Sequence, residues 1–198
     1  MPSDALTNTK LGIGITGSFC TFKKIFEELE SLHHKGYDLT TVFSYNAYTQ
    51  NTRFGSASHF ITKAEQLTQK DIICTITQAE RVGPAKMFDV FLIAPCTGNT
   101  LAKLASAITD TPVLMAAKSH LRNNRPVVIF LSTNDALAAN LSNIGTLLNR
   151  KNIYFVPFSQ DNPVDKPNSM ISDFSLIEDT IIAALNGTQL SPVISSHA

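Results

Sequence analysis

The stretch from Ala94 to Thr100 reads Ala-Pro-Cys-Thr-Gly-Asn-Thr and follows an apolar run. Glycine and small side chains let a backbone approach a flat ring closely, while amide and hydroxyl groups can bond the polar edge of that ring. Taken alone, the stretch is also compatible with a plain strand-to-helix turn, because Asn99 or Thr100 can cap the helical pattern that follows. A ligand site is favoured over a plain turn only if other polar residues are expected to lie beside this stretch in the fold.

Thr16-Gly17-Ser18 forms a second junction of this kind, between an apolar run and a helical pattern. Free backbone amides, hydroxyl groups and the helix dipole suit a phosphate group there. Without a second site, Ser18 would be read simply as a helix cap.

Gly12 to Gly17 formally satisfies the dinucleotide pattern GxGxxG, but its context argues against that use. The glycines of the fingerprint belong to the turn after a strand, whereas Leu11, Ile13 and Ile15 place Gly12 and Gly14 within the strand. A dinucleotide site also needs an acidic residue after the second strand, where this chain has Ser44. The sequence therefore disfavours an NAD site.

Five apolar runs, with room for helices between them, predict buried parallel strands. They are residues 11–16, 38–44, 89–94, 127–132 and 153–156. Helices are predicted between and after them, at 22–32, 101–109, from Thr111-Pro112 to Arg122, 135–148 and 175–185. This alternation predicts a three-layer, Rossmann-like α/β fold of the flavodoxin type, with a mostly parallel sheet flanked by helices.

Small polar residues follow four of these strands, at Thr16–Ser18, Ser44–Asn46, Pro95–Thr100 and Ser132–Asn134. In an open parallel sheet, ligands bind beyond the carboxyl ends of the strands, so the four stretches should gather around one crevice. Residues 158–170 break the pattern, being polar with two prolines, and are expected to form a lid-like loop. A surface connection is the alternative.

Composition narrows the class of protein. At 198 residues the chain is expected to form one domain over 1–198, and 16 Lys plus Arg balance 16 Asp plus Glu, which disfavours nucleic-acid or membrane binding. The first ten residues do not resemble a signal peptide, so a cytoplasmic location is expected. Cys20, Cys74 and Cys96 are scattered singly, which favours reduced thiols and no metal site.

Three phrases together resemble the flavoprotein superfamily of flavin-containing cysteine decarboxylases and flavin prenyltransferases. They are GITGS, PCTGNTLAKLA and TDTPVLMAAKSHLRNNRPVVIFLSTNDAL, within residues 10–160. The resemblance implies bound flavin mononucleotide (FMN). Carried over, it assigns Gly14, Thr16, Gly17 and Ser18 to the phosphate region, Ser44 and Asn46 to the adjacent wall, and Pro95, Cys96, Thr97, Gly98, Asn99 and Thr100 to the ring. Arg125, a cation immediately before Pro126 and the fourth predicted strand, is a further candidate to bind the flavin.

The chain also departs from that superfamily. Its cysteine decarboxylases carry a PxMNxxMW-like stretch, but the region from Pro112 to His120 lacks the asparagine. They also use a histidine, for which His59 is a candidate and an ordinary exposed residue is the alternative. Cys96 replaces an alanine of the family motif, and small size explains it better than nucleophilic catalysis.

Six further phrases resemble a narrower group within the superfamily. They are NTRFG, TDTPVLMAAK, NNRPVV, STNDAL, KNIYFVPF and KPNSM. The resemblance implies a subunit that works with a second, NAD(P)-binding subunit to oxidise a dihydrodipicolinate-type precursor to pyridine-2,6-dicarboxylate in a sporulating mother cell. Another flavin enzyme of the superfamily, or a noncatalytic subunit, remains an alternative. The superfamily also implies a homo-oligomer, a trimer or dodecamer with flavin at the boundaries between protomers.

A dicarboxylate substrate needs cations nearby. Arg53 and Lys166 are the first candidates, because they lie in polar stretches, and Lys118 and Asn168 are further ones. Each is also compatible with a solvated surface position.

Overall fold

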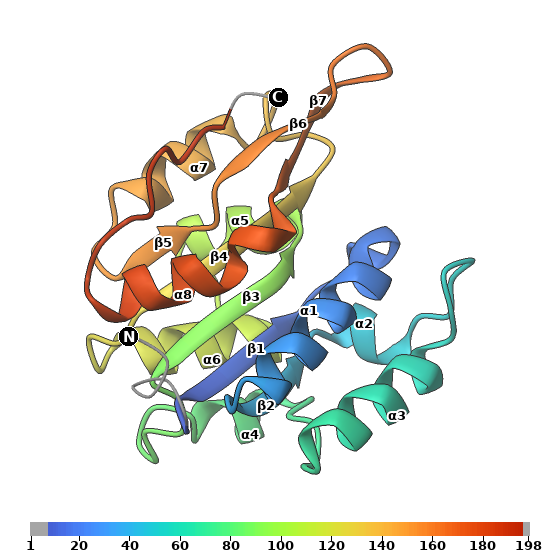
Figure 1. Cartoon of the computed structure of the whole chain (residues 1–198), viewed down its shortest axis with the longest axis vertical. Coiled ribbons are helices and arrows are strands. Elements are labelled where there is room, and N and C mark those ends of the chain that lie inside the picture. Colours follow the sequence, from blue (N-terminus) through green and yellow to red (C-terminus); the bar gives the residue numbers. More distant parts are fainter. Residues whose placement is uncertain (1–7, 196–198) are drawn as a thin grey trace.

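The computed structural model of the protein describes residues 8–195, so the two ends of the expected 1–198 domain lie outside the described residues. Five parallel strands form its centre (Figure 1). They are β1 (Lys10–Ile15), β2 (Asp38–Phe43), β3 (Val90–Cys96), β4 (Val127–Thr133) and β5 (Ile153–Phe155). Their order, β2-β1-β3-β4-β5, is that of flavodoxin-like folds, which confirms the predicted class.

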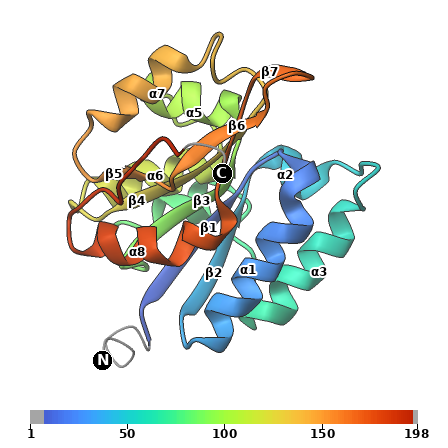
Figure 2. The same ribbon diagram turned by 45° about the horizontal axis from the view of Figure 1, so that its top comes forward.

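Helices cover both faces of the sheet and complete three layers (Figure 2). One face packs against α1 (Phe22–His34), α3 (Ala57–Thr68) and α8 (Ile177–Leu185). The other packs against α4 (Ile76–Glu80), α5 (Gly98–Ala105), α6 (Pro112–Leu121) and α7 (Leu141–Leu148). Side chains of β3 alternate between the two cores, with Leu92 facing α1 and Phe91 facing α6, as the period of a strand requires.

Several predicted boundaries were wrong. The helix expected over 101–109 ends at Ala105, and Ile108 is exposed. The helix expected over 135–148 begins only at Leu141, because residues 135–140 form turns in which Ala138 and Asn140 donate to the Asp135 carbonyl. The last helix is preceded by a short 3-10 turn, Phe174–Leu176. By contrast, Thr111 caps α6 as predicted, accepting from the Leu114 amide at 3.3 Å.

The segment 158–170 is not a loop. It forms a hairpin of β6 (Phe158–Asn162) and β7 (Lys166–Ser172), and β7 pairs antiparallel with the end of β4. The hairpin extends the sheet beyond β4 and projects past the carboxyl ends of the parallel strands (Figure 1). The polar residues after β2 form α2 (Tyr45–Thr49) and the start of α3, with a tight loop between the two helices.

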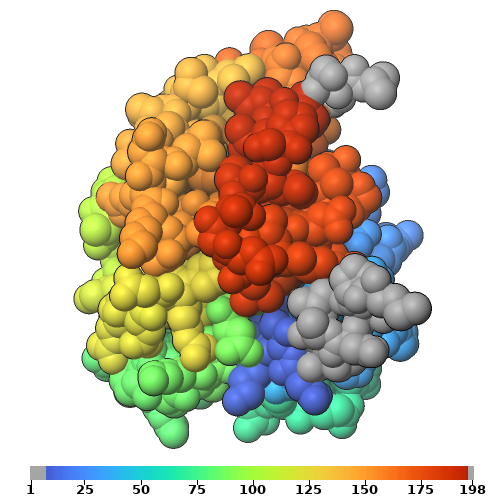
Figure 3. Space-filling view, turned by 60° about the vertical axis from the view of Figure 1, so that its left-hand side comes forward, coloured from blue at the N-terminus to red at the C-terminus, as the bar shows by residue number. Residues whose placement is uncertain are grey.

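The chain after α8 returns along the edge made by β5 and β6, and Figure 3 shows these red residues covering part of that face. The Gln189 side chain bonds both the amide and the carbonyl of Phe155, at 2.8 and 2.7 Å. Ile194 then pairs with Phe158 as an isolated bridge. The backbone groups of Phe155 and Phe158 are thereby satisfied, so this part of the edge is not free to pair with other chains.

Gly12 and Gly14 lie inside β1, as the sequence indicated, and their role is packing. A Cβ on Gly12 would overlap the buried Phe88 ring, and one on Gly14 would lie 2.9 Å from Val113 and 3.0 Å from Phe91. The glycines make room for large side chains on the α6 face of the sheet. Among the helices of the described residues, none is long and apolar enough to cross a membrane.

Gly12→Ala should lower the free energy of unfolding by about 1 to 3 kcal/mol, because the added methyl group overpacks the site against Phe88. Urea denaturation followed by circular dichroism measures the change. Gly145→Ala in α7 is the control, since its Cβ would meet nothing within 4 Å and helix propensity should raise stability by up to about 1 kcal/mol. Equal stability of the Gly12→Ala variant and the unsubstituted protein would contradict the packing role.

Candidate functional site

Two adjoining cavities open at the carboxyl ends of the parallel strands. The larger has a volume of about 730 Å³ and the smaller about 350 Å³. Gly17, Phe19, Thr97 and Asn99 line both, so the cavities share one wall. Their size and place match those of small-molecule sites in open α/β sheets.

Thr16 joins the two strand-to-helix junctions that the sequence singled out. Its buried hydroxyl donates to the Pro95 carbonyl at 2.7 Å and accepts from the Thr97 amide at 3.0 Å. Thr97 then caps α5, accepting from the Thr100 amide at 3.3 Å. The shared wall of the cavities is therefore held by hydrogen bonds between β1 and β3.

The start of α5 offers unused donors beside both cavities. Within residues 8–195, the backbone N–H groups of Gly98 and Asn99 donate no hydrogen bond, and neither does the exposed Asn99 side chain. The glycine at position 98 makes room for neighbouring polar side chains, since a Cβ there would lie 2.5 Å from the Asp135 carboxylate and 2.6 Å from the polar ends of Asn140 and Thr133. An acceptor-rich ligand would find its hydrogen-bond partners at this turn.

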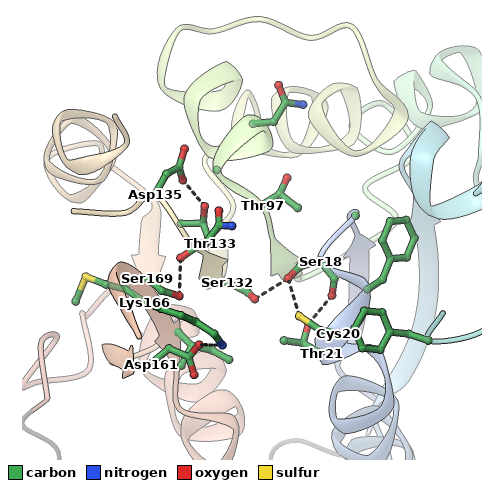
Figure 4. Close-up of a pocket in the computed structure, with 18 of the residues that line it drawn as sticks. Ser18, Cys20, Thr21, Thr97, Ser132, Thr133, Asp135, Asp161, Lys166 and Ser169 are labelled. Carbon is green, nitrogen blue, oxygen red and sulfur yellow. Dashed lines mark hydrogen bonds and ion pairs between the residues drawn. The ribbon is translucent and has the colours of Figure 1, made fainter. Parts of the chain in front are cut away.

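The remaining polar stretches lie around the same opening. Figure 4 shows Ser18 facing Ser132 across the mouth of the larger cavity, with their hydroxyl oxygens 2.7 Å apart. Ser44 caps α2 by accepting from the Ala47 amide at 3.3 Å, and it lines the smaller cavity with Asn46. The structure thus gathers the four stretches that follow β1, β2, β3 and β4.

Nine of the thirteen residues predicted to bind the flavin line the cavities: Thr16, Gly17, Ser18, Ser44, Asn46, Thr97, Gly98, Asn99 and Thr100. Three others lie behind the wall: Gly14 packs in the core, Cys96 is fully buried, and Pro95 contributes only its carbonyl to Thr16. These three support the site from within.

Arg125 was wrongly assigned to the flavin. It precedes β4 and therefore lies at the amino edge of the sheet, opposite the cavities. There its guanidinium donates to the Phe88 carbonyl and pairs with the Asp89 carboxylate at 3.2 Å. The Arg125 side chain braces the start of β3.

The other candidates divide between the larger cavity and the outer surface. Arg53 and Lys166 line the larger cavity, whereas His59, Lys118 and Asn168 are exposed outside both cavities. The Lys166 ammonium pairs with the Asp161 carboxylate at 2.6 Å. The Arg53 guanidinium lies over the Phe54 ring, 4.9 Å from its centre.

Sequence reasoning missed Phe19, Phe54, Asp135, Asp161 and Met170, all in the wall of the larger cavity. Asp161 and Met170 come from the hairpin that was expected to be a loop. Phe54 could have been noticed beside Arg53. Asp135 accepts from the Thr133 hydroxyl and from Asn140 at 2.8 Å, and lies against the start of α5, where a carboxylate is favourable.

Two buried titratable groups are unsuited to catalysis. Burial raises the pKa of the Cys96 thiol, so the thiol stays protonated within the core. Burial also lowers the pKa of His120 to about 4, which keeps the ring neutral, with Nε2 donating to the Pro126 carbonyl at 3.0 Å.

Cys20, in contrast to Cys96, is exposed and lines the larger cavity. Within the described part of the chain, no group of three or more His, Cys, Asp or Glu side chains is placed to hold a metal ion.

The fold and the paired cavities agree with comparison to known proteins. A model of the Flavoprotein family matches residues 1–186, and the chain belongs to that family. Within it, the chain is similar to the B subunit of dipicolinate synthase from Bacillus subtilis strain 168, with 46% identity over 190 residues that cover 96% of this chain and 95% of the relative.

Solved structures agree with this relationship. The crystal structure of the dipicolinate synthase B subunit from Bacillus halodurans C is 43% identical, covers 98% of this chain and 99% of its own, and superposes with a TM-score of 0.89. An FMN-dependent cysteine decarboxylase, SpaF, shares the fold with a TM-score of 0.69 at 22% identity, covering 91% and 99% of the two chains. The family is thus shown by sequence and by structure.

Alkylation of the folded protein with iodoacetamide should modify Cys20 and leave Cys96 unmodified, because one thiol is exposed in the larger cavity and the other is buried and protonated. Peptide mass spectrometry reads each site separately. Denaturation in urea is the control, since Cys96 should then react. Labelling of Cys96 in the folded protein at the rate of Cys20 would contradict its place in the core.

Proposed function

We propose that this chain binds FMN in the two joined cavities and serves as the flavoprotein subunit of a dipicolinate synthase. The observation that carries the proposal is the shared wall of Gly17, Thr97 and Asn99, fixed by the Thr16 hydrogen bonds and bearing unused donors. Membership of the Flavoprotein family and 46% identity to the B subunit of dipicolinate synthase support it.

The residues present fit a flavin. Small-molecule sites typically occupy about 300 to 1,000 Å³, a range that includes both cavities. A Cβ on Gly17 would meet no atom closer than 3.5 Å, so packing does not require glycine there, unlike at Gly12. Gly17 instead leaves its backbone open to a ligand on the shared wall.

The polar groups of the wall would hold the cofactor through hydrogen bonds. Amides at the start of α5 and hydroxyls of Ser18, Ser44 and Thr100 suit a phosphate and the polar edge of a ring. A bound flavin would supply a two-electron acceptor. The protein's part is to orient the substrate and to exclude water.

The reaction proposed is oxidation of a dihydrodipicolinate-type precursor to pyridine-2,6-dicarboxylate. Forming the aromatic ring drives this reaction strongly, so a dedicated general base is not required. The protein would act with the A subunit of dipicolinate synthase, on which NAD(P) is expected, in the cytoplasm of the mother cell of a sporulating bacterium. The relative's designation as one subunit of a synthase supports the need for a partner.

A homo-oligomer, a trimer or dodecamer, is part of the proposal. Tyr45 is an exposed aromatic side chain that lines the smaller cavity. Exposed apolar groups at a site often mark a surface that another protomer covers. Native mass spectrometry of the flavin-loaded protein measures the assembly.

Asn99→Ala should weaken FMN retention by about 1 to 3 kcal/mol, because an amide partner of the ring would be left unsatisfied. The purified protein should be yellow, and flavin released on heating gives its occupancy by absorbance. Asn149→Ala is the matched control, since Asn149 is exposed at the end of α7 and lines neither cavity. Unchanged flavin affinity in the Asn99→Ala variant would leave Asn99 as a structural residue only. A colourless protein that cannot be reconstituted with FMN would overturn the proposal itself.

Mixing the flavin-loaded protein with the NAD(P)-binding subunit, NAD(P) and the precursor should produce the ultraviolet absorption of pyridine-2,6-dicarboxylate faster than the same mixture without this chain. Replacing the loaded protein with apoprotein is the control for a purely structural contribution. Equal rates with and without this chain would count against the synthase assignment while leaving flavin binding intact. Equal acceleration by apoprotein would favour a noncatalytic role.

A further inference from the structure

A short, tightly bonded loop carries Arg53 and Phe54 to the larger cavity. Thr52 and Gly55 bond each other twice through their backbones, at 3.0 and 3.1 Å, and the Phe54 amide donates to the Thr52 hydroxyl at 3.2 Å. Such reciprocal bonding closes the loop over its two central residues. Arg53 and Phe54, which we call the loop tip, therefore stand out from a fixed base.

The base of the loop is anchored to the core of the protein. The Asn51 side chain accepts from the Ala57 amide at 2.9 Å, which ties the loop to the first turn of α3. Gly55 has a φ of +145°, and a Cβ there would lie 2.7 Å from the Phe60 ring. Phe60 is itself buried against Phe22. The loop is thus held in place, and it presents its tip without a large ordering cost on binding.

Both side chains of the loop tip are available. Phe54 is 46% exposed, and it lines the larger cavity together with Arg53. Within residues 8–195, the Arg53 guanidinium makes no ion pair and donates no hydrogen bond, and it lies over the Phe54 ring. A guanidinium stacked in this way keeps its N–H edges free for a carboxylate, which it can bind with two parallel hydrogen bonds.

Arg53 differs in this respect from the other charges of the larger cavity. Lys166 is already paired with Asp161 at 2.6 Å. Asp135 lies at the start of α5 and is bonded to Thr133 and Asn140. An anion that binds Lys166 must compete with the Asp161 carboxylate, whereas an anion that binds Arg53 displaces no carboxylate of the described residues.

We propose that the loop tip is the recognition element for a planar aromatic dicarboxylate, with Arg53 binding one carboxylate and the exposed surface of Phe54 contacting the flat ring. The inference rests on the proposed function, which makes pyridine-2,6-dicarboxylate the product. The inference goes further by assigning the selection for a carboxylate to Arg53 and the selection for a planar ring to Phe54. Phe54 favours an aromatic ring over a saturated one, because a flat ring packs against the part of the Phe54 ring that Arg53 leaves exposed.

The test is calorimetric titration of the flavin-loaded protein with two matched ligands. Benzene-1,3-dicarboxylate is planar, and cis-cyclohexane-1,3-dicarboxylate has the same two carboxylates on a saturated ring. Arg53→Gln should weaken binding of both ligands by about tenfold to a hundredfold, since a charge-assisted pair is lost. Phe54→Leu should weaken only the planar ligand, by about threefold to tenfold.

Arg81→Gln is the matched control, because Arg81 is an exposed arginine that follows α4 and lines neither cavity. The double variant Lys166→Gln, Asp161→Asn, which leaves no carboxylate unpaired, should have a smaller effect than Arg53→Gln, because Asp161 already neutralises Lys166. Circular dichroism and flavin occupancy establish that each variant is folded and loaded. Repeating the titration with pyridine-2,6-dicarboxylate extends the result to the proposed product.

The outcomes separate this inference from the proposed function. Normal flavin occupancy with unchanged affinity in Arg53→Gln overturns the role of the loop tip and leaves the flavoprotein assignment standing. An equal loss of both ligands in Phe54→Leu overturns the selection for planarity. A protein that takes up no flavin overturns the proposed function, and the apoprotein titration then tests whether the loop tip still binds the dicarboxylates.

Discussion

The hydroxyl of Thr16 is the contact on which the site depends. It is buried at the end of β1, and it both donates to Pro95 and accepts from Thr97. A buried hydroxyl that lost either partner would leave a polar group without water, at a cost of about 1 to 3 kcal/mol. This single side chain therefore fixes the turn before α5 relative to the turn before α1. The shared wall of the two cavities exists because these turns cannot move apart.

Packing beneath that wall follows from the same strand. Gly12 and Gly14 leave one face of β1 without side chains, and Phe88, Phe91 and Val113 fill the space. Leu11, Ile13 and Ile15 fill the opposite face against α1. Because Gly12 and Gly14 carry no side chains on this face, Val113 of α6 can pack directly against the backbone of β1. Gly17, three residues beyond Gly14, has no side chain packed this closely against it. Gly12 and Gly14 therefore make room for core side chains, whereas Gly17 leaves the backbone accessible from the cavities.

The parallel strands could be predicted because both of their faces are buried, which leaves continuous apolar runs in the sequence. The β6–β7 hairpin could not, since Asp161, Lys166 and Asn168 are exposed and its pairing partner is the distant β4. The start of α7 was missed because backbone bonds to Asp135 hold residues 135–140 in turns that helix patterns do not reveal. Arg125, however, was a misreading: a residue before a strand faces the amino edge of the sheet, whereas ligands bind at the carboxyl edge.

The candidate substrate-binding cations could be predicted from the sequence, but whether each is paired with a carboxylate could not. Arg53 and Lys166 both lie in polar stretches, but Lys166 has Asp161 and Asp165 within five residues, whereas no acidic residue is as near to Arg53 in the sequence. The hairpin fold brings Asp161 to Lys166, whereas the loop from Asn51 to Ser56 brings only an aromatic ring to Arg53. An ion pair lowers the attraction that its cation offers to an anion, so the two cations differ as ligand groups. The nearby carboxylates are visible in the sequence, but the ion pair requires the β6–β7 hairpin, which turns the chain so that Asp161 lies beside Lys166.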